Sequence, residues 1–329
     1  VGITIETRPD YINEKEIKRL RQFGVTRVEL GIQSIYDDVL KLNRRGHGVK
    51  ETILATCLLK DAGFKICYQM MPNLPGSNLK RDEKMFKEIF SNPDFQPDLL
   101  KIYPCALLKE APLYRVWKKM DYKPYSEKQL ISLIAAIKKE IPFYCRIQRI
   151  IRDFPSDKVA GGGAKISNLR QYLLKLQKDK GWKCRCIRCR EVKGNYNPKE
   201  KIYLFREDYA ASGGKEIFLS FENKTKEKLF SLLRLRTASE KVIFPSLSRA
   251  AIIREIHTYG QLYPLSPNDG SVISPQHKGL GKEMIKEAEK IVKKEFGLKK
   301  IAAIAGVGSR EYFRKLGYSL KEEYMIKKL

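Results

Sequence analysis

A glycine-containing segment late in the chain is the first candidate for chemistry. Residues 276–281 read Gln-x-x-Gly-x-Gly and precede a helical pattern over residues 282–296. Glycines let the backbone approach a ligand closely, and free N–H groups at a helix start bind phosphate. The segment therefore predicts a pyrophosphate cradle for coenzyme A rather than an ordinary glycine turn. The context favours the cradle because a strand pattern at 250–258 precedes it and a strand–helix unit at 301–316 follows.

Three cysteines at close spacing predict a metal site. Cys184, Cys186 and Cys189 form a C-x-C-x-x-C pattern interleaved with arginines. Three thiolates suit a tetrahedral zinc ion that needs one more ligand. Cys145 is the expected fourth ligand, because it directly precedes this segment at the end of the strand–helix region. The three histidines of the chain, His47, His257 and His277, are weaker candidates, and an iron–sulfur cluster on the three thiolates is the alternative.

Acyl transfer from a thioester requires a proton acceptor and a group that polarises the thioester. Polar side chains near the cradle are Glu255, His257, Tyr312 and Tyr318. We take His257, Tyr312 and Tyr318 as the candidate catalytic residues. The sequence does not single out one base, and an ordinary core histidine on a strand remains the competing interpretation of His257.

The segment around the cysteines is strongly basic. Residues 165–201 contain twelve Lys or Arg against three Asp or Glu, with Tyr172, Trp182 and Tyr196 interleaved. The whole chain carries 65 Lys or Arg against 38 Asp or Glu, a formal charge of +27. Such a charge favours a polyanionic partner, most plainly nucleic acid, over a merely solvated surface. The candidate RNA-binding residues are Lys165, Arg170, Lys183, Arg185, Arg188, Arg190 and Lys193.

Residues 1–150 alternate strand and helix patterns, and these elements must position the candidate sites. Strands are expected at 3–7, 25–30, 64–70, 99–103 and 144–150, and helices at 14–23, 50–62, 79–90 and 127–141. Repeated strand–helix units predict an α/β fold with a parallel sheet that closes as a barrel or part-barrel. Polar residues collect where strands end, including Glu6, Glu29 and Gln33, and active sites of such barrels lie on that rim.

The remaining chain divides into a linker and a second domain. Residues 151–200 break the alternation and contain the basic metal-binding segment, and residues 201–329 return to strands around the cradle. No run of eighteen apolar residues occurs, so we expect no membrane-spanning helix and a cytoplasmic protein. The seven cysteines are then expected as thiols or metal ligands. Because the chain begins inside a strand-like run, we expect it to be part of a longer protein.

Several motifs together resemble the Elongator catalytic-subunit family. They are residues 3–10 (ITIETRPD), 28–34 (VELGIQS), 71–77 (MPNLPGS), 254–257 (REIH), 276–281, 304–308 (IAGVG) and 312–318 (YFRKLGY). The resemblance covers nearly the whole chain. It implies a partial radical S-adenosylmethionine (SAM) (β/α) barrel at 1–150, a zinc-binding basic linker at 151–200 and a GNAT-like acetyltransferase domain at 201–329.

The resemblance further implies a tRNA-modifying enzyme that forms the carboxymethyl group on the wobble uridine. Its cofactors would be acetyl-CoA, zinc and, in the intact protein, SAM with a four-iron cluster. Glu6, Glu29 and Gln33 would face SAM and the base. The residues implied to hold acetyl-CoA are Glu255, Ile256, His257, Thr258, Gln276, Gly279, Leu280, Gly281, Lys282 and Phe313. Expected partners are tRNA and either a second copy of the chain or other Elongator-type subunits.

Two departures from the family pattern are visible. No cysteine triplet of the cluster-binding kind precedes Cys57, so we expect residues 1–329 to lack the four-iron cluster. Phe313 stands where the family has a tyrosine beside Tyr312, which removes a hydroxyl. Two alternative functions stay open: a protein-lysine acetyltransferase of the same fold, and a zinc-containing RNA-binding protein with a decayed acetyl site.

Overall fold

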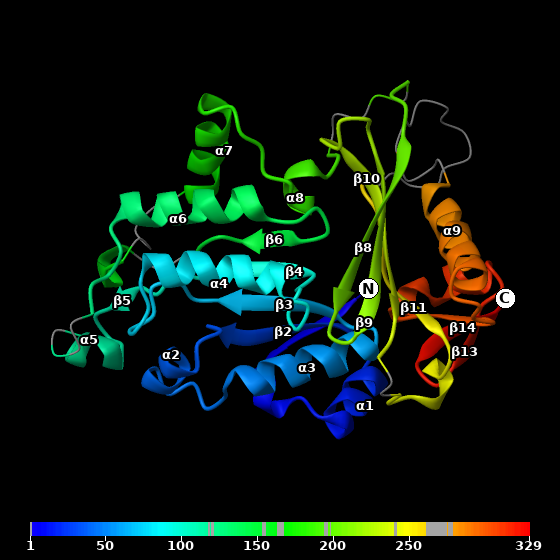
Figure 1. Ribbon diagram of the computed structural model, residues 1–329, viewed down its shortest axis with the longest axis horizontal. Coiled ribbons are helices and arrows are strands. Elements are labelled where there is room, and N and C mark those ends of the chain that lie inside the picture. Colours follow the sequence, from blue (N-terminus) through cyan, green and yellow to red (C-terminus); the bar gives the residue numbers. More distant parts are fainter. Residues whose placement is uncertain are drawn as a thin grey trace.

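The computed structural model describes residues 2–117, 119, 122–152, 156–162, 168–193, 197, 199–239, 242–260, 275 and 279–329. They form two units, each built on a β-sheet, that lie side by side (Figure 1). Within these residues no helix is long and apolar enough to cross a membrane. The predicted mixture of helices and strands is therefore present as two packed α/β units.

A five-stranded parallel sheet forms the first unit. Its order is β1-β2-β3-β4-β6, and each neighbouring pair is parallel. The strands are β1 (Ile3–Thr7), β2 (Val25–Gln33), β3 (Lys65–Met70), β4 (Leu99–Ile102) and β6 (Arg146–Arg149). Over the described residues the sheet stays open at β1 and β6, so the part-barrel expectation holds and full closure does not.

Helices connect these strands, as the sequence predicts. They are α1 (Glu14–Gln22), α2 (Asp37–Leu42), α3 (Val49–Asp61), α4 (Leu79–Ser91) and α6 (Glu127–Glu140). Side-chain caps fix several helix starts: the Asn13 and Asn78 side chains each accept a backbone N–H at 3.0 Å, and Ser126 with Gln129 forms a capping box. These caps fix the residue at which each helix begins, and so they fix the length of the loop that leads into the helix.

The segment predicted as a linker packs against the first unit. It contains α7 (Leu169–Asp179) and the short α8 (Ile187–Arg190). Leu169 and Leu173 bury the inner face of α7 in the same core as α6. A small antiparallel pair, β5 (Leu107–Leu108) and β7 (Val159–Gly161), and helix α5 (Pro112–Val116) lie in the loops of this unit.

A seven-stranded sheet forms the second unit, in the order β13-β14-β12-β11-β10-β9-β8. Its strands are β8 (Tyr203–Ala211), β9 (Gly214–Glu222), β10 (Leu229–Thr237), β11 (Ala251–Thr258), β12 (Lys300–Ala303), β13 (Ser319–Lys321) and β14 (Tyr324–Lys328). Helices α9 (Leu280–Lys294) and α10 (Arg310–Arg314) follow β11 and β12. The sequence did not resolve the three long antiparallel strands β8, β9 and β10.

Strands β11 and β12 diverge after a short parallel pairing. They pair only from Ala251 to Ile253 on β11 and from Ile301 to Ala303 on β12, where β12 ends. Strand β11 continues to Thr258, paired only with β10 on its other side. The backbone of β11 beyond Ile253 therefore has one edge without a strand partner among the described residues.

Buried charges join the two units. Arg254 on β11 donates to the two oxygens of Asp98, just before β4, at 2.6 and 2.9 Å. Arg236 on β10 binds Asp61 at the end of α3 at 2.5 Å. Glu216 on β9 accepts from both arginines at 3.1 Å. All five side chains are at most 1% exposed, so each depends on the others for compensation of its charge.

Further groups extend this network. Lys60 lies 3.9 Å from Asp98 and 3.8 Å from Glu216, and complete burial lowers the pKa of its ammonium group to about 8. Arg234 on β10 donates to the Tyr144 carbonyl at 2.6 Å, across the junction. One apolar core also runs through the junction, since side chains such as Ile66 and Ile252 belong to the same cluster. The units consequently have a fixed relative position.

We predict that Arg254→Met destabilises the protein by about 3–5 kcal/mol, because Asp98 and Glu216 would lose a buried counter-charge. Chemical denaturation measures this loss. Arg206→Met is the matched control: it removes ion pairs with Asp208 and Glu295 whose side chains are about a third exposed or more, and should cost at most about 1 kcal/mol. Equal losses for the two variants would contradict the role of the buried network.

Candidate functional site

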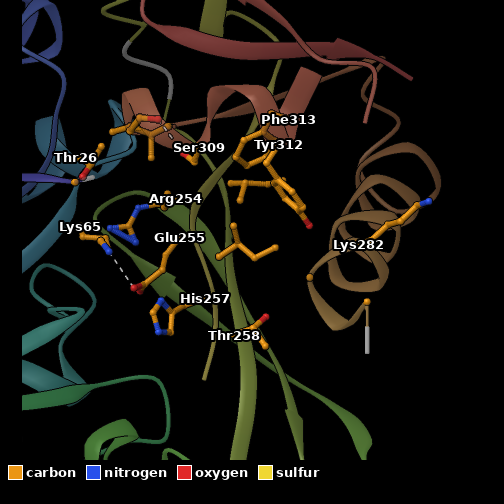
Figure 2. A pocket seen from close by; sticks show the side chains of 17 residues that line it. Thr26, Lys65, Arg254, Glu255, His257, Thr258, Lys282, Ser309, Tyr312 and Phe313 are labelled. Carbon is orange, nitrogen blue, oxygen red and sulfur yellow. Dashed lines mark hydrogen bonds and ion pairs between the residues drawn. The ribbon is translucent and has the colours of Figure 1, made fainter. Parts of the chain in front are cut away.

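A cavity of about 550 Å³ lies where the two units meet (Figure 2). One wall comes from β11, the start of α9 and α10. The opposite wall comes from the beginnings of the parallel strands, where Thr26 and Lys65 lie. The described lining residues are Gly2, Thr26, Lys65, Ile253, Arg254, Glu255, Ile256, His257, Thr258, Gly279, Gly281, Lys282, Ile304, Gly306, Ser309, Tyr312 and Phe313.

The two glycines of the predicted cradle lie at the start of α9, beside this cavity. Gly279 caps the helix with a φ of 71°, a conformation that favours glycine. A Cβ atom at Gly281 would lie 2.9 Å from the Tyr312 hydroxyl oxygen, so a larger residue there would require the Tyr312 side chain to move. Lys282 also lines the cavity, whereas Leu280 points into the core. Gln276 and His277 lie outside the described residues.

The predicted β11 residues line the cavity together. Lys65 donates to Glu255 at 3.0 Å and Arg234 donates to its other oxygen at 2.8 Å. Burial raises the pKa of Glu255, but these two cations outweigh it and hold the pKa well below its usual range. Glu255 is therefore an ionised, fully engaged carboxylate and a poor proton acceptor. Ile256 and Thr258 continue the same strand along the cavity.

Of the three candidate catalytic residues, two reach the cavity. His257 is exposed on the cavity wall, and partial desolvation there lowers the pKa of its imidazole, which is neutral at pH 7 and can accept a proton. Tyr312 is 41% exposed and directs its hydroxyl toward α9. The structure corrects the prediction that Tyr318 is catalytic. Its side chain is 3% exposed, donates to Glu289 at 3.0 Å and is not part of the cavity lining. Phe313 lines the cavity from α10.

The predicted rim residues lie at the other, carboxyl end of the parallel sheet. Glu6 and Glu29 are register neighbours on β1 and β2. Glu29 is buried and accepts from Gln69 at 3.2 Å and from Lys101. Gln33 has a φ of 70°, and its buried Oε1 has no hydrogen-bond partner. The rim is thus a separate site from the cavity, because each occupies one end of the same strands.

Arg45 is a rim residue that the sequence analysis missed. Its guanidinium is half-buried, its Nε has no hydrogen-bond partner and it forms no ion pair with a carboxylate that the structure describes. Burial and the neighbouring Arg8 lower the pKa of Arg45. A Cβ atom at Gly31 would lie 3.0 Å from Gln33 Nε2 and 3.7 Å from Arg45 Nη2. Asp10 raises this pKa, so Arg45 is a cation beside Gln33 whose charge is compensated only in part.

The three thiols of the C-x-C-x-x-C pattern converge. The sulfur atoms of Cys184, Cys186 and Cys189 all lie within 4.8 Å of one another. Hydrogen bonds from the other two thiols hold the pKa of Cys186 well below its usual range. Lys138 on α6 donates to Cys189 at 3.5 Å. The donor set fits a thiolate-bound metal ion.

Cys145 requires a correction as the fourth ligand. Its thiol is fully buried in the core of the first unit and does not belong to the group of converging sulfur atoms. Its backbone also lies beside this segment, since the Cys145 carbonyl accepts from the Ile187 N–H at 3.0 Å. Chain proximity therefore misled the sequence prediction, and the three thiols are the ligands that the described residues provide.

The predicted RNA-binding residues divide into exposed and buried groups. Lys183, Arg185 and Lys193 are exposed, and Arg170 and Arg188 are partly buried. The structure corrects the prediction that Arg190 binds RNA. Its side chain is 5% exposed, pairs with buried Glu222 and donates to a backbone carbonyl at 2.6 Å. Its role is to hold the second unit in place. Lys165 lies outside the described residues.

Comparison with known proteins decides the family. The model of the radical SAM superfamily matches residues 1–89, and that of the radical SAM C-terminal domain matches residues 97–177. A solved structure of the archaeal Methanocaldococcus infernus Elp3 with an N-terminal deletion superposes with a TM-score of 0.92. It is 47% identical in sequence, over 100% of this chain and 78% of that one. The chain belongs to the Elp3 family.

Curated members of the Elp3 family are similar over the whole chain. "tRNA uridine(34) acetyltransferase" of Methanocaldococcus infernus is 48% identical, with 100% of this chain and 62% of the relative covered. "Elongator complex protein 3" of Homo sapiens is 43% identical, with 100% and 60% covered. The chain thus spans about three fifths of the length of the curated relatives it matches. The resemblance found in the sequence motifs is confirmed.

For this Elp3-family chain we expect about one zinc ion per chain, bound by the converging thiols, and no four-iron absorption after anaerobic reconstitution. Cys186→Ser should lose the zinc because three ligands become two. Cys145→Ser is the control and should keep it, since that thiol lies apart. Elemental analysis and visible absorption measure both metals. Loss of zinc in the control, or an assembled four-iron cluster in wild type, would contradict the assignment.

Proposed function

We propose that this chain is the part of a tRNA uridine-modifying enzyme that binds acetyl-CoA and contributes the rim of its radical SAM site. The names of its close relatives, which the chain matches along its whole length, support tRNA uridine as the substrate. The radical SAM match supports SAM and an iron–sulfur cluster as cofactors of the intact enzyme. The product would be the carboxymethyl derivative of the wobble uridine.

The cavity supports acetyl-CoA as its ligand. Gly279 and Gly281 leave the first N–H groups of α9 accessible, which suits a pyrophosphate. From there the unpartnered edge of β11 runs along the cavity, and its free backbone groups suit an amide-containing chain such as the pantetheine arm. The acyl end would then lie beside the part of β11 that follows Ile253 and has no described strand partner on this edge, facing Thr26 and Lys65. Bound acetyl-CoA would supply an activated acetyl thioester.

The single observation that carries the proposal is the position of Lys65 and Thr26. They belong to the parallel sheet and close the cavity on the side opposite α9. A protein lysine acceptor would have to approach the acyl end from this side, where the first unit already lies. The position thus favours an acetyl unit used inside the two-unit assembly over transfer to an external protein, which is the competing acetyltransferase function.

The residues around the acyl end have separable roles. Neutral His257 would accept a proton from the attacking group. Glu255 would stay ionised and hold Lys65 across the junction. Tyr312 would keep its hydroxyl beside the start of α9. These assignments follow from the pKa directions and contacts of the side chains.

At the rim, Arg45 and Gln33 fit the carboxylate and polar groups of SAM. Arg45 offers a guanidinium whose charge is compensated only in part, and Gln33 offers a buried, unpartnered acceptor. SAM with its cluster would supply the radical chemistry. Glu6 and Glu29 would line the same end of the sheet, as the sequence predicts.

We predict that Gly281→Val abolishes acetyl-CoA binding, because its side chain would displace Tyr312 and occupy the pyrophosphate path. Lys286→Val, on an exposed position of the same helix, is the control for helix propensity. Titration calorimetry measures the affinity, and thermal unfolding checks the fold. Unchanged affinity in a folded Gly281→Val variant would remove the cavity from consideration as the coenzyme site.

The function itself is tested by acetyl-CoA turnover with and without tRNA. We expect tRNA to raise turnover, and lysine-containing peptides to leave it unchanged. Peptide acetylation without any tRNA effect would favour the protein-acetyltransferase alternative. RNA binding without acetyl-CoA binding would favour the decayed RNA-binding alternative.

A further inference from the structure

A second cavity, of about 420 Å³, lies beside the rim of the parallel sheet. Its walls come from the carboxyl ends of β4 and β6, the first turn of α7 and the short helix α8. The described lining residues are Lys101, Gln148, Arg149, Ile150, Ile151, Asn168, Leu169, Arg170, Gln171 and Arg188. Its volume falls in the roughly 300–1,000 Å³ range of small-ligand sites.

The cavity lining is cationic. Lys101, Arg149, Arg170 and Arg188 come from four different elements, and no acidic residue is among the described lining residues. Lys101 is compensated by Glu29. Arg170 and Arg188 form no ion pair with a described carboxylate and donate only to backbone carbonyls, at 3.4 and 3.5 Å. Burial and Arg188 lower the pKa of Arg170, and the three nearby thiols offset this only in part. Two arginines that face one cavity without a carboxylate therefore favour an anionic ligand.

These cations are held in place by the fold. Arg188 lies on α8 between Cys186 and Cys189, so the converging thiols fix the turn that carries it. Arg170 lies beside Leu169, which is 1% exposed and anchors the start of α7. Preorganised guanidinium groups lose less conformational freedom on binding than free surface lysines do. The cavity is therefore a built concave site, unlike the exposed basic face around it.

Its location connects the cavity with the rim. Lys101 lines the cavity and also bonds Glu29, which contacts Gln69 at the rim. The acetyl-CoA cavity is distant in the fold, since it lies at the beginnings of the same strands. An anion bound here would thus be next to the radical site and separate from coenzyme A.

We propose that this cavity binds a phosphate-bearing nucleotide of the RNA strand next to the nucleotide that is modified. The proposal rests on the proposed function. Arg170 and Arg188 would hold the phosphate, and the side-chain amides of Gln148 and Gln171 would meet the edges of a base. Since a single-stranded segment exposes both phosphate and base edges, this lining suits an unpaired RNA loop better than a duplex.

The test compares two double variants with equal loss of charge. Arg170→Gln/Arg188→Gln removes the two cavity arginines, and Lys175→Gln/Lys178→Gln removes two exposed lysines of α7. Fluorescence anisotropy measures the binding of a labelled single-stranded uridine-containing RNA over a range of salt. The cavity variant should bind about tenfold more weakly or worse. The slope of log affinity against log salt should fall by about 0.7 for each lost phosphate contact.

The matched lysine variant should change affinity by at most about twofold, because exposed lysines are well screened. Arg188→Lys keeps the positive charge but replaces the planar guanidinium with a single ammonium group. Its RNA affinity should lie between the affinities of wild type and of the cavity variant. This variant also guards against a simple folding defect, with thermal unfolding as the check.

Three outcomes would overturn the inference. Equal losses in the two double variants would show that bulk charge alone matters. Competition of SAM with the RNA for this cavity would assign it to the cofactor. Displacement of the RNA by an acidic peptide at equal affinity would assign it to a protein partner. A wild-type chain that binds no RNA at low salt would instead refute the proposed function itself.

Discussion

The buried charge network at the junction is the constraint on which the rest of the structure depends. Two arginines, Arg236 and Arg254, form ion pairs with Asp61, Asp98 and Glu216, and all five side chains are almost completely buried. Taking these charges out of water costs several kcal/mol per ion, which only close pairing offsets. A shift of one unit over the other would break these pairs, so the network determines which residues face each other across the cavity between the units.

That fixed junction places two candidate sites at opposite ends of one set of strands. Lys65 begins β3 and lines the cavity between the units, while Gln69 on the same strand contacts the rim carboxylate Glu29. In the proposed function, the acetyl thioester and the radical site would lie at these two ends, separated by the length of the strands.

Local sequence patterns predicted the elements well and long-range packing poorly. Strand–helix alternation in residues 1–150 and the glycine turn before α9 depend on short-range backbone preferences, so the strands and helices appear near their expected positions. Arg190 was assigned to RNA binding because it lies in the basic segment, and Tyr318 to catalysis because it is a polar group near the cradle. Their burial depends on Glu222 and Glu289, which lie 32 and 29 residues away. Cys145 was chosen by sequence proximity, which does not determine where a side chain points.

Arg45 and the junction arginines Arg236 and Arg254 are residues whose positions could not be predicted from the local sequence. Nothing in the local sequence distinguishes Arg45 from the adjacent Arg44, and only the kinked end of β2 brings it beside Gln33. The family resemblance, by contrast, was found from the sequence because its motifs combine across the whole chain.

The central claim is that the acyl end of bound acetyl-CoA faces the parallel sheet. A structure determined with a non-hydrolysable acetyl-CoA analogue tests it most directly. The account predicts the pyrophosphate at Gly279 and Gly281 and the acyl carbon beyond Ile253, facing Thr26 and Lys65. An acyl group directed toward solvent, away from the Lys65–Glu255 pair, would contradict the claim.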